Sequence, residues 1–315
     1  MQVAGRLHVV TGALGYTGKS LAERLIARGA RVRTLTNSPH RPNPFGDSLE
    51  VRPLSFDDSD ALARSLDGAD VLYNTYWVRF NHRLFTFEGA VANTRTLFEA
   101  ATRAGVRRIV HVSILHADKA DDLGYYRGKH ELEDALRASG VPHSIVRPGV
   151  LFGRGDILVN NIAWALRRLA VFGVFGDGGY ALRPLHVDDM ASLMLDEAAR
   201  TGDSCVDAVG QERFTYKELV RSLSETIGVK RAIVNVPPAL GLCVARLINP
   251  LVRDVIITKE EVGGLMRGLL DSGAPAVGSI RLTDWASEHR DSLGRRYANE
   301  VGRRVQRAKA YAEVR

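Results

Sequence analysis

Apolar residues in the first 150 positions fall into short runs that alternate with amphipathic segments. Six runs rich in β-branched residues predict strands, and they read RLHVV, ARVRTLT, LEVRPLS, DVLYNTY, RIVHVSI and HSIVRPG. Between them, apolar residues at helical spacing predict helices over 19–28, 59–66, 86–104 and 125–139. This alternation is typical of an α/β fold with a parallel, doubly wound sheet, which binds ligands at the carboxyl ends of its strands.

Beyond residue 155 the strand and helix alternation is lost. Helical patterns cover 157–171, 188–200, 216–227, 238–253, 259–271 and 295–312, with scattered short strands between them. Thr258 and Glu261 have the spacing of a capping box at the start of one of these helices. We therefore expect a Rossmann-type domain over 1–153, to which a segment at about 180–210 returns, and a smaller, mostly helical cap over 154–315.

The loop after the first apolar run carries the first recognisable chemistry. Residues 9–20 read VVTGALGYTGKS and place three glycines at three-residue spacing, at Gly12, Gly15 and Gly18. A mononucleotide P-loop would need glycine where this chain has Ala13. A helix and a second strand follow within about 30 residues, which is the setting of a dinucleotide-binding βαβ unit. The helix N-terminus would hold the pyrophosphate, and Lys19 is expected to be solvated.

The second chemical motif is YYRGK at residues 125–129. Tyr125 and Lys129 are four residues apart, so they share one face of a helix. An ammonium group that favours the phenolate brings a tyrosine into the range of proton transfer at neutral pH. Lys129 is also placed to hold the ribose hydroxyls of a nicotinamide nucleotide. The pair predicts hydride transfer between such a cofactor and a carbonyl or alcohol substrate.

These motifs, with SIVRPGVLFGRGD and RPLHVDDMA, resemble the short-chain dehydrogenase/reductase superfamily in its extended and atypical branches, over about residues 6–210. Those branches include NAD(P)-dependent epimerase/dehydratase-like and NmrA-like proteins. HVSILHA with YYRGK is similar to the subgroup that contains the dehydrogenase-like accessory subunit of respiratory complex I and its bacterial relatives. The resemblance implies that Tyr125 is the acid/base and Lys129 its partner and ribose anchor. It also implies that the backbone from Pro148 to Val150 passes the nicotinamide carboxamide.

One position departs from the extended pattern. Leu115 stands where those proteins usually carry the Ser or Thr that polarises the substrate carbonyl. Ser113 would point to the same side of the strand and is a candidate substitute, and His116 is another. The departure leaves three functions open: an oxidoreductase, which we favour; a non-catalytic structural or assembly protein stabilised by NADP(H); and a sugar-type epimerase or dehydratase.

The end of the second strand bears on the choice of nucleotide. Thr36 stands where proteins that prefer NAD(H) carry an acidic residue for the ribose 2′-hydroxyl. The segment RVRTLTNSPHRP has no carboxylate but holds groups that donate to a 2′-phosphate, so we favour NADP(H) over NAD(H). The candidate catalytic residues are Tyr125, Lys129 and Ser113. The candidate cofactor contacts are Gly12, Gly15, Tyr16, Thr17, Gly18, Asn37, Ser38, Arg41, Ser55, Phe56, Thr75, Tyr76, Lys129, Pro148 and Val150.

Composition narrows the remaining classes of protein. The net charge is +7, but residues 290–315 hold eight Lys or Arg against three Asp or Glu, so the rest of the chain is nearly balanced and nucleic acid is not expected. Tyr297, Val301 and Val305 at four-residue spacing predict a C-terminal helix that is docked by one face with its arginines outward. Those arginines would form a solvated face or, alternatively, a patch for an anionic membrane surface or a protein complex. The nine histidines have no metal spacing, and two cysteines fit a cytoplasmic protein. A homodimer stays open.

Overall fold

The computed structural model describes residues 3–311 and 314. The chain divides into two compact units, of which unit 1 comprises Met1–Arg147 and Met190–Asp207. Unit 2 comprises Pro148–Asp189 and Ala208–Arg315. Residues 148–153, which the sequence analysis assigns to the first domain, thus belong to unit 2.

Unit 1 is built on a seven-stranded sheet in the order β11-β6-β5-β4-β1-β2-β3. Its strands are β1 (Leu7–Thr11), β2 (Arg31–Thr36), β3 (Leu49–Pro53), β4 (Val71–Asn74), β5 (Arg108–Val112), β6 (His143–Pro148) and β11 (Ser204–Ala208). The pairings from β6 through to β3 are parallel. The predicted doubly wound α/β sheet is confirmed, since the strands after β1 are added on one side up to β3 and then, from β4 on, on the other side of β1.

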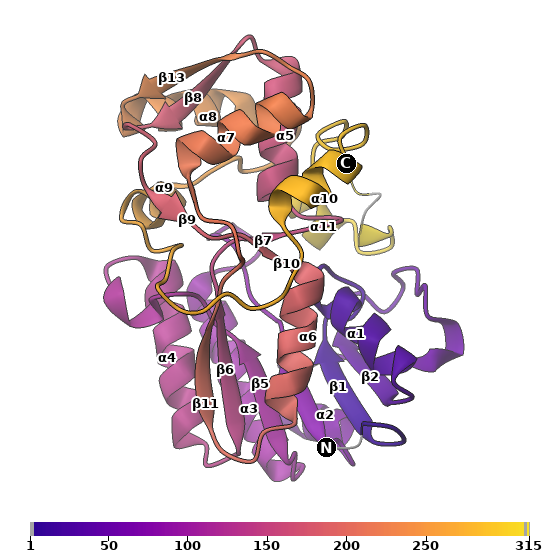
Figure 1. Cartoon of the computed structure of the whole chain (residues 1–315). Helices are drawn as coiled ribbons and strands as arrows, with labels where there is room; N and C mark the ends of the chain where they lie inside the picture. The colour runs from indigo at the N-terminus through magenta and orange to yellow at the C-terminus, as the bar shows by residue number, and fades with distance from the viewer. Residues whose placement is uncertain (1–2, 312–313, 315) are drawn as a thin grey trace. The chain divides into compact units, whose positions relative to one another are not determined.

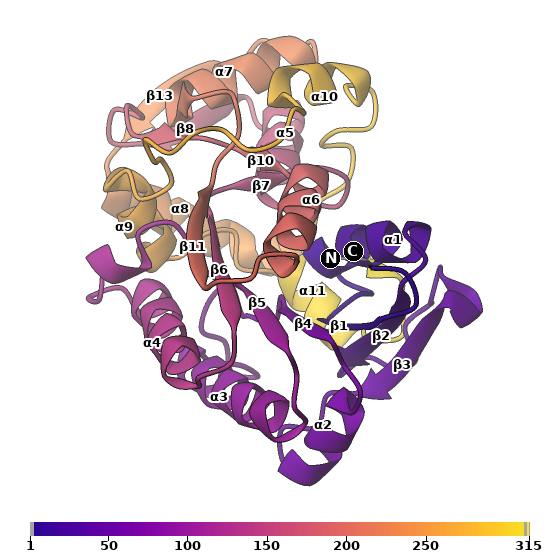
Figure 2. The ribbon, with the colours of Figure 1, turned by 60° about the horizontal axis from the view of Figure 1, so that its bottom comes forward.

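Helices cover both faces of this sheet. Figure 2 shows α2 (Ser59–Leu66), α3 (Phe87–Arg103) and α4 (Gly124–Ala138) on one face, and α1 (Thr17–Ala27) with α6 (Val187–Ala198) on the other. The helices predicted from apolar spacing agree with α1 to α4 within two residues at each end. A core of buried apolar side chains fills the space between the sheet and α2, α3 and α4, and includes Val9, Leu72, Leu97 and Leu132.

Unit 2 combines short sheets with helices around its own apolar core (Figure 1). Its helices are α5 (Leu158–Arg168), α7 (Tyr216–Thr226), α8 (Pro238–Val252), α9 (Lys259–Met266), α10 (Leu282–Glu288) and α11 (Glu300–Val305). Its strand pairs are β7 (Leu151–Phe152) with β10 (Leu185–His186), β9 (Ala181–Leu182) with β12 (Phe214–Thr215), and β8 (Val171–Phe175) with β13 (Ala232–Val236). Short 3-10 helices occupy Gly46–Ser48 and Ala117–Lys119 in unit 1.

The predicted helix over 295–312 is wrong in extent, since the described part is helical only in α11. Asn299 starts this helix, because its side chain accepts from the Gly302 N–H at 2.6 Å. Tyr297 lies before this cap, Val305 is 53% exposed and Arg303 is buried, so the expected docked apolar face with arginines outward is not formed. Residue 312 lies outside the described residues.

Candidate functional site

The glycine loop between β1 and α1 is closed by its own backbone. The Gly15 N–H donates to the Gly12 carbonyl at 2.8 Å, and Gly12 has a φ of +73°, which favours glycine. At Gly18 a side chain would overlap the Gly12 carbonyl group, since a Cβ there would lie 2.7 Å from the carbonyl carbon. Gly18 therefore allows α1 to begin directly against the loop, as the dinucleotide motif requires.

The N-terminus of α1 is open to an anion. Tyr16 occupies the N-cap position and Thr17 begins the helix, and in this described stretch no side chain caps α1 and no acidic residue stands in its first turn. The first N–H groups of the helix and its positive dipole end therefore face the loop without a competing carboxylate. Lys19 is half exposed and lies 3.8 Å from Glu23, in agreement with its prediction as a solvated residue.

The ends of β1 and β4 are joined at the same edge of the sheet. The Thr11 hydroxyl accepts from the N–H groups of Thr75 at 2.8 Å and Tyr76 at 3.1 Å, and the Thr75 hydroxyl donates to the Thr11 carbonyl at 2.6 Å. The Tyr76 ring packs 5.0 Å from Phe56, which follows β3 together with the partly buried Ser55. These candidate cofactor residues are thus held beside the glycine loop.

The turn after β2 carries the groups predicted to select the nucleotide. The Thr36 hydroxyl accepts from the Ser38 N–H at 3.0 Å, and the Arg41 N–H donates to the Ser38 carbonyl at 3.1 Å. Arg41 is 7% exposed, whereas Asn37 is exposed. The turn therefore holds the backbone of Arg41 next to Ser38, and residues 37–41 contain no carboxylate.

Tyr125 and Lys129 share a face of α4, and both meet Trp77 from the loop after β4. The Lys129 Nζ donates to the Val112 carbonyl at 2.7 Å and lies 4.5 Å from the centre of the Trp77 ring. The Tyr125 ring meets that ring edge-on at 5.7 Å. Burial lowers the pKa of Lys129 to about 7, against the opposing effect of the Glu133 carboxylate. The Lys129 side chain therefore changes between its charged and neutral forms near neutral pH.

A buried ion network behind Lys129 was not predicted from the sequence. Glu133 is fully buried and accepts from the Arg147 Nε at 2.8 Å, from Arg137 at 2.9 Å and from the Ser113 hydroxyl at 2.6 Å. It follows Lys129 by four residues, so the spacing that pairs Lys129 with Tyr125 also places Glu133 on this face. The network joins α4 to β5 and β6.

This network removes support for Ser113 as the donor to a substrate carbonyl. Ser113 is 2% exposed and its hydroxyl is committed to Glu133. Leu115 is fully buried. His116 is partly exposed and has a φ of 55°, a left-handed conformation that costs a non-glycine residue about 1 kcal/mol. Of the two residues that the sequence offered for the missing donor, His116 is therefore the one whose side chain is partly accessible.

Gly128, the fourth residue of YYRGK, leaves space for the ring of Trp77. A Cβ there would lie 2.8 Å from the Trp77 Cη2 and 3.1 Å from a methyl group of Val91. We expect Gly128→Ala to displace the indole and to lower the free energy of unfolding by about 1–3 kcal/mol. Tryptophan fluorescence and urea unfolding measure the two effects. Gly202→Ala, where nothing lies within 4 Å of an added Cβ, is the control. An unchanged fluorescence spectrum for Gly128→Ala would contradict this packing.

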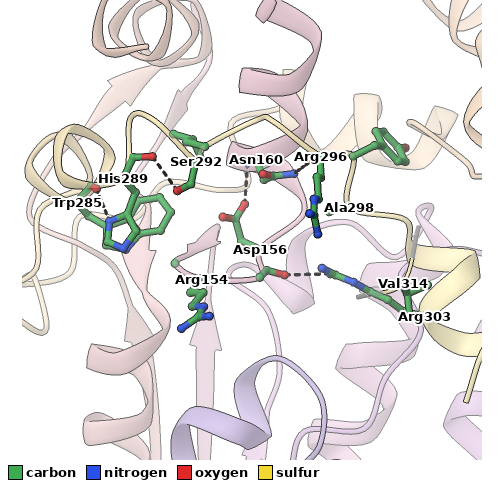
Figure 3. A pocket seen from close by; sticks show the side chains of 14 residues that line it. Arg154, Asp156, Asn160, Trp285, His289, Ser292, Arg296, Ala298, Arg303 and Val314 are labelled. Atoms are coloured by element: carbon green, nitrogen blue, oxygen red, sulfur yellow. Dashed lines mark hydrogen bonds between the residues drawn. The ribbon is translucent and has the colours of Figure 1, made fainter. Parts of the chain in front are cut away.

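Unit 2 contains a cavity of about 320 Å³ that no sequence motif indicated (Figure 3). Asp156 in its wall is 2% exposed, and one carboxylate oxygen accepts from the Asn160 N–H at 3.0 Å. Burial raises the pKa of Asp156 to about 7. The cavity is lined by Gly153, Arg154, Gly155, Asp156, Asn160, Trp285, His289, Ser292, Leu293, Arg296, Tyr297, Ala298, Arg303 and Val314.

The predicted cofactor contacts Pro148 and Val150 lie at the end of β6 and just after it. Pro148 ends β6, and the carbonyl of the buried Val150 accepts from the Leu185 N–H at 2.8 Å.

Comparison with known protein families finds a match for the first part of the chain. Residues 12–157 match the family model described as NAD(P)H-binding. This stretch is an NAD(P)H-binding domain. It contains the glycine loop, the turn after β2 and the Tyr125 and Lys129 face of α4. The resemblance to the extended and atypical short-chain dehydrogenase/reductases is confirmed for the NAD(P)H-binding domain.

Several known proteins are similar to this one over most of the chain. NADH dehydrogenase [ubiquinone] 1 alpha subcomplex subunit 9 of Arabidopsis thaliana is 26% identical, over 86% of this chain and 72% of the relative. A (4-alkanoyl-5-oxo-2,5-dihydrofuran-3-yl)methyl phosphate reductase of Streptomyces griseus is 27% identical, over 90% and 98%. Among solved structures, an NADPH-dependent quinone oxidoreductase of Escherichia coli has the same fold, with a TM-score of 0.71 and 20% identity over 91% of this chain and 99% of that one.

Proposed function

We propose that the protein is an NADP(H)-dependent oxidoreductase that interconverts a carbonyl and an alcohol. The observation that carries this proposal is the pairing of Tyr125 with a buried Lys129 on one face of α4, inside the NAD(P)H-binding domain. A buried ammonium group is a costly feature for a protein to keep. Its position four residues from a tyrosine matches a proton-transfer role, and a reductase among the relatives supports the same chemistry.

In the proposed reaction the bound nicotinamide supplies or accepts the hydride. Tyr125 gives its phenolic proton to the carbonyl oxygen during reduction and takes it back during oxidation. The positive charge of Lys129 favours the phenolate form of Tyr125, and its ammonium group binds the ribose hydroxyls. His116 donates to the substrate oxygen in place of the hydroxyl that Leu115 lacks. Glu133 and Arg147 hold α4 in place behind these groups.

The preference for NADP(H) within the proposal depends on the turn after β2. Arg41 offers a planar guanidinium that suits the 2′-phosphate, and the Ser38 hydroxyl adds a donor. Thr36 closes the turn with a neutral side chain and so does not repel that phosphate.

A second candidate is a non-catalytic protein in which the nucleotide stabilises the fold. The buried Leu115 and the engagement of Ser113 by Glu133 favour it, because the usual donor to a substrate carbonyl is missing. The relative from Arabidopsis thaliana is named as a subunit of an NADH dehydrogenase and supports the same reading.

One experiment separates the two candidates. We expect the purified protein to bind NADPH more tightly than NADH, and to oxidise NADPH in the presence of aldehydes or ketones. Tyr125→Phe should keep NADPH affinity within about threefold and lower turnover by about 100-fold or more, because only the proton donor is lost. Fluorescence titration and absorbance at the nicotinamide band measure these quantities. NADPH binding without turnover on any carbonyl would favour the non-catalytic protein.

A further inference from the structure

Helix α8 exposes an apolar face where a surface helix normally carries polar residues. Leu240, Val244, Leu247 and Leu251 follow one another at helical spacing and are 53%, 45%, 77% and 82% exposed. The remaining exposed residues of the helix are Ala239, Cys243, Arg246 and Pro250. This face therefore presents one charged side chain among apolar ones.

The opposite face of α8 explains why the helix keeps this orientation. It turns Gly241, Ala245 and Ile248 toward the protein, and α8 contacts β8, beside which it lies in Figure 1. A Cβ on Gly241 would come within 3.0 Å of the Phe175 ring, so the helix packs closely at this point. The exposed leucines are thus a fixed surface of unit 2.

The charged residues of α8 and of the segments that flank it in the chain have one sign. Residues 228–253 contain Lys230, Arg231, Arg246 and Arg253 and no Asp or Glu. Arg246 and Arg253 are exposed, and within the described part of the chain neither forms an ion pair. Asp254, which follows, is buried and accepts from the N–H groups of Glu300 and Val301 at 2.8 and 3.0 Å. The surface is therefore apolar with a positive rim.

We propose that the apolar face of α8 is a membrane-binding surface that docks the protein on the interface of an anionic lipid bilayer. Leucine side chains that enter the boundary between headgroups and acyl chains, flanked by arginines that meet anionic headgroups, are the features of an interfacial helix. No helix of the described residues has the length and apolar character needed to cross a membrane, so the surface would lie on the bilayer.

A second copy of the chain suits this face less well. The outward side of α8 offers eight residues, whereas a stable protein interface takes about 20–30 residues from each partner. A twofold contact through α8 would also place Arg246 and Arg253 of both copies in one interface, to which residues 228–253 contribute no carboxylate. An anionic bilayer supplies the opposite charge and needs only a few inserted side chains.

Co-sedimentation with vesicles of phosphatidylcholine, with and without phosphatidylglycerol, tests the proposal on the full chain. We expect binding that is about tenfold stronger to the anionic vesicles. Leu247→Asp with Leu251→Asp should lower that binding by about tenfold without loss of folding, because both side chains are largely exposed. Arg246→Glu with Arg253→Glu should remove the preference for anionic vesicles.

The matched control is Leu84→Asp, which changes a leucine of unit 1 that is 60% exposed and should leave vesicle binding unchanged. Absence of binding to anionic vesicles, or binding that the paired aspartates do not reduce, would overturn the proposal. Light scattering that shows a dimer dissociated by the same paired substitution would assign the face to a second copy and would also overturn it.

Discussion

Gly18→Ala is expected to abolish NAD(P)H binding, with a loss of affinity of about 100-fold or more. The added methyl group would overlap the backbone carbonyl of Gly12. Neither the alanine Cβ nor a carbonyl group can turn aside by a change of rotamer, so the clash can be relieved only by movement of the backbone. The loop must then move away from the N-terminus of α1, and the N–H groups that would hold the pyrophosphate lose their alignment. We also expect the free energy of unfolding to fall by about 2 kcal/mol.

Fluorescence titration with NADPH measures the first effect and urea unfolding the second. Gly202→Ala is the matched control in the same unit, because nothing lies within 4 Å of a Cβ at that position. A folded Gly18→Ala variant that binds NADPH with unchanged affinity would remove the glycine loop from the nucleotide site.

Six of the seven strands of the sheet could be predicted because each is a short run rich in β-branched residues bounded by turns, whereas β11 was not among the predicted runs. The central strands β1 and β5 are buried on both faces, so RLHVV and RIVHVSI lack the regular alternation of apolar and polar residues that a half-exposed strand shows. The helix over 259–271 was extended too far, because Gly268 takes a φ of +69° and ends it near Met266. The predicted capping box of Thr258 and Glu261 is present.

The candidate site was predictable only where local spacing determines it. Tyr125 and Lys129 share a helix face by periodicity alone, whereas Trp77 reaches Lys129 from a loop 52 positions earlier in the chain. The partnership of Glu133 with Arg147 likewise depends on α4 packing against β6. Contacts between distant segments leave no mark in local pattern, so the role of Gly128 also became clear only from the Trp77 ring beside it.

The C-terminal region shows how charge and apolar spacing misled the sequence analysis. Arginines in the tail suggested a solvated docking helix, but Arg303 is buried and Arg304 pairs with Glu300. Asn299 donates to the Val252 carbonyl at 2.8 Å, so the tail is tied to the end of α8. Removal of residues 295–315 would therefore disturb unit 2, and the paired substitutions at exposed positions of α8 and its C-terminal end test membrane association more cleanly.

Lys129→Met is expected to make the cofactor-free protein more stable while it weakens NADPH binding by about tenfold or more. Burial lowers the pKa of the ammonium group from 10.5 to about 7, so protonated Lys129 costs folding free energy below pH 7. Methionine fills the space beside Trp77 without a charge but leaves the Val112 carbonyl without its donor. We expect the free energy of unfolding of Lys129→Met to exceed that of the wild type by about 2 kcal/mol at pH 6.

The stability difference between Lys129→Met and the wild type should depend on pH. Between pH 7 and the ordinary lysine value the unfolded chain holds a proton that the folded chain has lost, so the stability of the wild type rises with pH in this window. The advantage of Lys129→Met should therefore be largest below pH 7 and shrink as the pH rises toward 10, as urea unfolding at several pH values would show. Lys119→Met, at an exposed lysine of the same unit, should show neither the gain nor the loss of NADPH affinity. A Lys129→Met variant that is less stable at pH 6 and binds NADPH normally would mean that the buried ammonium serves the fold rather than the nucleotide.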